Sequence, residues 1–140
     1  MGIERHVVHP DRVTRESGLW SHASSVRLPG ARLIFIAGQT ARRQDGTALP
    51  GDDFDAQFRL VYENLEAVLA ASGARFADVV SLRTFLRRAG DIERFWALRD
   101  EAHRQRFPGG NYPPNTLVVV DRMAHPEMLV EIEAVAVVEA

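Results

Sequence analysis

The stretch "DDFDAQFRLVYENLEAVLAASG", residues 52 to 73, decides the fold because it is the clearest helix in the chain. Apolar side chains recur in it at helical intervals over about five turns, which predicts one buried face. They are Phe54, Phe58, Val61, Tyr62, Leu65, Val68 and Leu69. Asp52 is the predicted N-cap, Asp53 and Asp55 suit the first turn, and Gly73 is placed to end the helix.

Strands and a second helix alternate around this segment. "SSVRLPGARLIFIAG" at 24 to 38 predicts a hairpin that turns at Pro29-Gly30, and "VVSLRTFL" at 79 to 86 predicts a further strand. "DIERFWALRDEAHRQRF" at 91 to 107 has helical spacing. "TLVVV" at 116 to 120 and "MLVEIEAVAVVE" at 128 to 139 are two more predicted strands. The predicted order is ββαβαββ.

This order indicates an α+β fold with a mixed sheet and both helices on one face. The 140 residues contain no linker long enough to divide them, so residues 1–140 are predicted to form a single domain. The strands "LIFI" and "TLVVV" are apolar on both sides. We therefore expect oligomerisation to bury the sheet face that the helices leave bare.

Composition excludes several classes of function. Zero cysteines exclude thiolate chemistry and sulfur-ligated zinc, and they favour a reducing cytoplasm. A net charge of −2 with scattered basic residues argues against nucleic acid as a partner. The N-terminus, "MGIERHVVHPDRV", predicts neither a secretory signal nor a membrane span. The five histidines show no metal-binding spacing, and no G-x-S-x-G elbow exists for a serine hydrolase.

Five fragments in order resemble the Rid family, also called the YjgF or L-PSP proteins. They are "GLWSHA" (18–23), "IAGQT" (36–40), "AQFRLVYENLEAVLAASG" (56–73), "YPPNTLVVV" (112–120) and "VEIEAVAV" (130–137). The resemblance implies a subunit similar to the small trimeric chorismate mutases, assembled as a homotrimer with clefts between subunits. It also implies cofactor-free hydrolysis of reactive enamines and imines to ketoacids and ammonia.

The resemblance implies a substrate site that departs from the family pattern. In the Pro-Ala-Arg-Ser/Thr motif, whose arginine grips the substrate carboxylate in deaminating members, this chain has Asn115 followed by Thr116. An asparagine carries no charge, so we expect weak binding of 2-imino acids. Trp20 replaces the family tyrosine, and Ala37 replaces the serine of Ser-Gly-Gln, which continues here as Gly38 and Gln39.

Two charged residues complete the predicted site. Glu131 matches the first glutamate of Glu-Ile-Glu-Ala and is the candidate for positioning or activating water, with an exposed strand residue or an arginine partner as the alternative. Arg99 lies near the position of a family asparagine and could supply the missing cation, although a solvated helix residue is the simpler interpretation. Asn115 and Trp20 have simple structural alternatives as well, at a strand entry and in an interface.

Two classes of function remain open after this comparison. The first is hydrolysis of an imine or enamine other than the usual 2-imino acid in an intersubunit cleft. The second is a trimeric small-molecule-binding or regulatory module without turnover. The endoribonuclease label attached to this family is disfavoured because the chain has only 8% aromatic residues and none is grouped on a basic strand.

Overall fold

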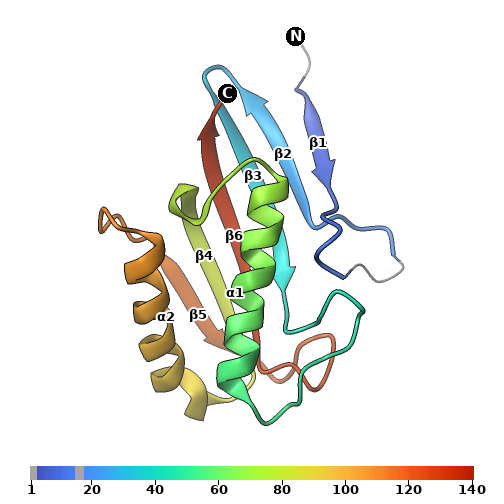
Figure 1. The fold of residues 1–140 in the computed structure, drawn as a ribbon, viewed down its shortest axis with the longest axis vertical. Helices are drawn as coiled ribbons and strands as arrows, with labels where there is room; N and C mark the ends of the chain where they lie inside the picture. The colour runs from blue at the N-terminus through green and yellow to red at the C-terminus, as the bar shows by residue number, and fades with distance from the viewer. Residues whose placement is uncertain (1–2, 15–17) are drawn as a thin grey trace.

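Two helices lie across one face of a six-stranded sheet in the computed structural model, which describes residues 3–14 and 18–140 (Figure 1). The helices are α1 (Phe54–Ala71) and α2 (Ile92–Arg106). The strands are β1 (Arg5–Val8), β2 (Ala23–Leu28), β3 (Ala31–Gln39), β4 (Val79–Leu86), β5 (Asn115–Val119) and β6 (Val130–Glu139). The predicted α+β class, mixed sheet and one-sided helix layer are confirmed, and β1 is an addition.

The spatial order of the strands is β1-β2-β3-β6-β4-β5. All neighbours are antiparallel except β4 and β5, which are parallel and joined by the crossover through α2. β1 pairs only with β2 and is almost wholly exposed, so its sequence "RHVV" carries no clear alternation to predict it. Backbone pairing with β2 fixes the position of β1, and the sequence pattern of one strand does not reveal its pairing partner.

The start of α1 differs from the prediction by one residue. The Asp53 carboxylate accepts from the backbone N–H of Ala56 at 2.9 Å, so Asp53 is the N-cap and Asp52 lies outside the helix. A capping side chain must reach an N–H two or three residues further on, and Asp53 has that spacing to Ala56. At the other end Gly73 has a φ of +74°, the left-handed conformation that commonly ends a helix.

The hydrophobic core lies between α1 and the central strands β3, β6 and β4 (Figure 1). β6 alternates strictly, with Val130, Ile132, Ala134 and Ala136 buried toward the helices. Each fully buried large aliphatic side chain stabilises the fold by about 1.5–3 kcal/mol. The alternate side chains of the same strands point to the opposite face of the sheet.

Two buried polar residues of α1 hold loops at one end of the sheet. Gln57 is fully buried; its amide nitrogen donates to the carbonyls of Pro50 and Glu127, and its amide oxygen accepts from the N–H of Leu129. Asn64 donates to the carbonyls of Thr40 and Arg42 at 2.9 and 3.0 Å. The loops after β3 and before β6 are therefore fixed to the same helix.

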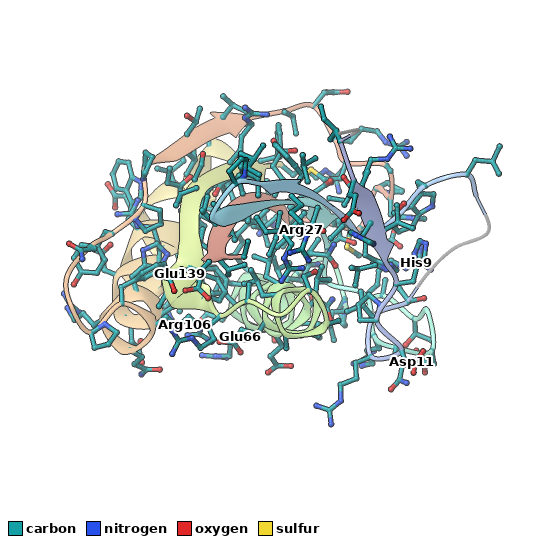
Figure 2. The ribbon with its side chains drawn as sticks, turned by 90° about the horizontal axis from the view of Figure 1, so that it is seen from above. His9, Asp11, Arg27, Glu66, Arg106 and Glu139 are labelled. Carbon is teal, nitrogen blue, oxygen red and sulfur yellow. The ribbon has the colours of Figure 1, made fainter. Side chains whose placement is uncertain are left out.

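An ion pair joins the two helices. Figure 2 shows Arg106 of α2 beside Glu66 of α1, and Arg106 Nε donates to the Glu66 carboxylate at 2.6 Å. The Arg106 guanidinium also lies 5.3 Å from the ring centres of Tyr62 and Phe76, within the range of cation–π attraction. This contact keeps α2 at a fixed position beside α1.

The face of the sheet away from the helices carries exposed apolar side chains, as the sequence predicted. Phe35 of β3 is 46% exposed, and Val118 of β5 is 41% exposed. Ile34 and Ile36, on either side of Phe35, are buried toward the helices, so Phe35 points to the other face. We call this surface, with Phe35, Phe85, Val118 and Val135, the open face.

Candidate functional site

A β-bulge next to Glu131 shapes the main candidate site. Ile36 pairs with Ala134 and Gln39 with Ile132, so β3 has one more residue than β6 in this interval. The extra residue lies at Ala37-Gly38, and bulges of this kind often redirect side chains beside functional sites. Gln39 braces the bulge because its amide nitrogen donates to the Ala37 carbonyl at 2.9 Å.

Gly38 lies directly against the Glu131 side chain. A Cβ on residue 38 would lie 2.1 Å from Glu131 Oε1 and 2.9 Å from its Cδ, closer than atoms can approach. The glycine is therefore required for space, since its φ lies outside the left-handed region. Any larger residue would displace the carboxylate.

A cavity of about 260 Å³ opens beside this carboxylate. We call it the Glu131 pocket. It is lined by Val13, Thr14, Trp20, His22, Gly38, Gln39, Thr40, Arg42, Asn64, Ala124, His125 and Glu131. Four of the residues predicted from the sequence thus meet in one place: Trp20, Gly38, Gln39 and Glu131.

The surroundings of Glu131 favour its protonated form more than water would. Burial raises the pKa of Glu131, the nearby Glu133 charge adds to the rise, and His125 partly opposes it. Glu133 itself is paired with Arg83 across the strands. A carboxylate with a raised pKa is a stronger base once ionised, which suits proton abstraction from water.

His125 and Arg42 also line the pocket, and the sequence analysis did not assign them to the site. Arg42 Nη1 lies 2.7 Å from His125 Nε2, and Arg42 also donates to the Gly46 carbonyl. A guanidinium can only donate, so in this contact Nε2 is the acceptor when the His125 ring is neutral. The two residues are 83 positions apart in the chain, a separation that no local pattern reveals.

His22 is a further residue that the sequence analysis left unassigned. It is 1% exposed, its Nε2 lies 2.9 Å from the Thr14 carbonyl oxygen, and its Nδ1 has no hydrogen-bond partner among the described residues. Its ring contacts Trp20 with centroids 4.9 Å apart. A buried unpaired acceptor costs about 1–3 kcal/mol, so its retention calls for an explanation. The sequence signal that could have identified His22 was its position in the fragment "GLWSHA", two residues after Trp20.

The structure places Asn115 away from the Glu131 pocket. Asn115 begins β5, its side-chain oxygen accepts from the Thr84 hydroxyl at 3.0 Å, and its amide nitrogen is buried without a partner. It pairs with Leu82, which is buried toward the helices, so Asn115 faces the helix layer. Asn115 therefore lies at a strand entry, as its structural alternative expected, and the partner of its side chain is a strand hydroxyl.

Asn115 and Arg99 instead line a second cavity of about 430 Å³, which we call the Arg99 cavity. Its walls are Arg99, Asp100, His103, Arg104, Tyr112, Pro113 and Asn115. Arg99 donates through Nε and Nη2 to its neighbour Asp100 at 3.1 and 2.8 Å. Burial and two nearby arginines lower the pKa of His103 to about 4, so His103 is neutral and the cavity keeps a net positive charge.

The remaining predicted site residues lie in neither cavity. Thr116 is exposed and pairs with Arg83, so it points to the open face. Ala37 follows Phe35 on β3 and lies beside it on the same surface. The predicted set is therefore divided among the Glu131 pocket, the Arg99 cavity and the open face of one subunit.

Residues 3–14 and 18–140 contain neither a candidate metal cluster nor a membrane-spanning helix. No group of three or more histidine, cysteine, aspartate or glutamate side chains in that part of the chain could hold a metal ion. No helix there is long and apolar enough to cross a membrane.

Comparisons with known proteins agree with this architecture. The family described as Endoribonuclease L-PSP matches residues 16–138. Protein DfrA of Myxococcus xanthus is 33% identical over 135 residues, covering 96% of this chain and 97% of that protein. TdcF of Escherichia coli K12, named provisionally as a reactive intermediate deaminase, is 30% identical over 107 residues, covering 75% and 78% of the two chains.

Solved structures show the same fold. The structure of E. coli TdcF with bound serine has a TM-score of 0.80 at 23% identity and covers 95% of this chain and 98% of that one. A Thermotoga maritima protein described as an endoribonuclease has a TM-score of 0.79 at 26% identity, with coverage of 96% and 98%.

Proposed function

Because the chain belongs to the L-PSP family, also known as the Rid or YjgF family, we propose that it hydrolyses a reactive imine or enamine and releases ammonia. The reactive intermediate deaminase name of TdcF supports this class of reaction. The proposed substrate is other than the usual 2-imino acid. No cofactor is required, because a protonated imine carbon is already electrophilic.

The observation that carries the proposal is Glu131, half-buried in a cavity and held against Gly38. In the proposed reaction Glu131 accepts a proton from water as the hydroxyl adds to the iminium carbon. Glu131 then returns this proton to the amine nitrogen of the carbinolamine. The carbon–nitrogen bond breaks, the hydroxyl loses its proton to the departing ammonia, and the products are a carbonyl compound and ammonium.

The position of Asn115 supports a substrate without the usual carboxylate head. Its side-chain oxygen is engaged with Thr84, and its amide nitrogen is buried, so it offers no clamp comparable to an arginine fork. The Arg99 cavity supplies positive charge, but Arg99 itself is already paired with Asp100. Trp20 provides an aromatic wall that suits an apolar or extended substrate.

Assembly is part of the proposal. The predicted residues occupy three separate places on one subunit, and the proposed homotrimer, with clefts between subunits, would bring Thr116 on the open face of one copy toward the Glu131 pocket of another. The exposed apolar open face supplies a reason for association. The intersubunit cleft and the cytoplasmic location are both expectations from the sequence.

The test is release of ammonia or carbonyl product from imines generated in place by an oxidase. One substrate carries an α-carboxylate, 2-iminopropionate, and one lacks it, the imine of benzaldehyde. Wild-type protein should act on the second and weakly or not at all on the first, and Glu131→Gln should abolish the difference from the uncatalysed rate. Efficient turnover of 2-iminopropionate would contradict the proposed substrate class.

A binding module without turnover is the second candidate. The positively charged Arg99 cavity favours it, as does the serine found in the TdcF structure, which has the same fold. If folded protein hydrolyses none of the tested imines, and if it binds a ligand that Arg99→Gln binds more weakly, this candidate would be favoured. Endoribonuclease activity is not proposed, since the net charge is −2 and basic residues are scattered.

A further inference from the structure

His22 lies in the wall of the Glu131 pocket with one nitrogen bonded and the other unpaired. Nε2 lies 2.9 Å from the Thr14 carbonyl oxygen, which can only accept, so Nε2 carries the ring proton. Nδ1 of the neutral ring therefore presents a lone pair. That atom is buried and has no partner among the described residues.

The ring is held in this orientation from several sides. The Trp20 ring lies 4.9 Å away, centroid to centroid, and the His9 ring meets the His22 ring edge-on at 5.8 Å. With the Thr14 bond, these contacts leave the side chain little freedom to turn Nδ1 toward another protein group. The unpaired acceptor is thus held in one orientation, on a residue that lines the Glu131 pocket.

The pocket combines this acceptor with a second one. Both His22 and Glu131 line it, and a histidine lone pair and a carboxylate each call for a donor. The cationic group in the same wall, Arg42, is directed to the Gly46 carbonyl and His125. Such a pocket suits a positively charged N–H donor better than an anion.

We propose that His22 is a substrate-binding residue whose Nδ1 accepts a hydrogen bond from the N–H of a protonated imine. This inference rests on the proposed function and adds its selectivity: imines that bear an N–H are bound in preference to fully alkylated iminium ions. His22 fixes the nitrogen, while Glu131 stays available for the attacking water.

Benzamidinium is a stable probe of this contact, since it has a planar, charged C=N with N–H donors and is not an imine substrate. Benzyltrimethylammonium is the matched probe with a charge but no N–H. Binding is followed by the fluorescence of Trp20 in a Trp96→Phe background, which removes the exposed second tryptophan. Wild-type protein should prefer benzamidinium.

Two substitutions separate the bonds of the two ring nitrogens. In His22→Gln the amide nitrogen can still donate to Thr14, so the protein should stay folded while benzamidinium binds about tenfold more weakly, the loss of one charge-assisted hydrogen bond. In His22→Asn the amide oxygen replaces Nδ1, so more of the preference should remain despite lower stability. His6→Gln, at an exposed histidine, should change neither.

Equal binding of benzamidinium by His22→Gln and wild type would overturn the inference, as would no benzamidinium binding by folded wild-type protein. Failure of the proposed function has a different signature. If no imine is hydrolysed but benzamidinium binding still depends on His22, the contact stands and the catalytic proposal falls.

Discussion

At the scale of single residues, the contact between Gly38 and Glu131 makes a sharp prediction. Gly38→Ala should still fold, because the backbone at residue 38 is accessible to alanine, and its loss of thermal stability should be limited to the cost of moving the Glu131 side chain. The new Cβ would displace the carboxylate, and misplacement by about 1 Å can cost about 10²-fold in rate. The measurement is kcat for imine hydrolysis together with Tm.

Gly90→Ala is the matched control for this change. Gly90 has no atom within 4 Å of a Cβ and no left-handed φ, so the same substitution there should leave kcat unaltered. A fully active Gly38→Ala protein would show that the position of Glu131 does not limit the reaction.

The raised pKa of Glu131 predicts the pH dependence of the reaction. Glu131 acts when ionised, so kcat/KM should fall as the pH drops through its pKa, and this limb should lie above the usual range of a glutamate. Glu133→Gln removes a charge that contributes to the rise, so it should move the acid limb to lower pH. A limb that moves upward, or not at all, would contradict this account of the electrostatics.

The sequence identified only part of the candidate site, and the reason lies in chain distance. Glu131, Gly38 and Trp20 lie in motifs with recognisable local patterns. His125 reaches the pocket because Gln57 and Asn64 tie loops from opposite ends of the chain to α1. Asn115 was predicted from its position in a motif, but its orientation depends on Thr84 in a neighbouring strand. Contacts between distant segments follow from the fold and not from spacing.

At the scale of elements, Gln57 should be essential for fixing the segments before α1 and before β6 to the helix. Gln57→Leu leaves the Pro50 and Glu127 carbonyls and the Leu129 N–H without their buried partner. We expect a loss of about 3 kcal/mol or more in the free energy of unfolding. Denaturant titration measures it, and Gln44→Leu, at an exposed glutamine, is the control.

The packing of α2 against α1 predicts how stability varies with pH. The pKa of His103 is about 4 when folded and near its usual 6.5 when unfolded, so unfolding takes up a proton between these values. Stability contributed by neutral His103 is complete above about pH 6.5 and should be lost as the pH falls toward 4, with a slope up to about 1.4 kcal/mol per pH unit. His103→Gln should reduce this slope, and an unchanged slope would assign it to other groups.

At the scale of the whole molecule, the periodic segments predicted the architecture well. Helical spacing of apolar residues at 52–73 and strict alternation in β6 each indicate that one side of the element is buried. One-sided burial is a property of the final fold that a local sequence pattern can reveal. β1 escaped prediction because an exposed edge strand of four residues buries too little to need a pattern. The Asp52 and Asp53 difference shows the same limit, since two adjacent aspartates are distinguished only by the path of the chain.

The open face predicts association of subunits. Phe35 is 46% exposed in the isolated subunit, so Phe35→Lys should leave the fold of one subunit within about 0.5 kcal/mol of wild type while weakening assembly through a charge at the interface. Trp96→Lys is a control with similar exposure, 48%, on the helix layer. Sedimentation equilibrium should give a trimer for wild type and Trp96→Lys, and smaller species for Phe35→Lys. A monomeric wild type would remove the open face as an interface, and a Phe35→Lys trimer would place the contact elsewhere.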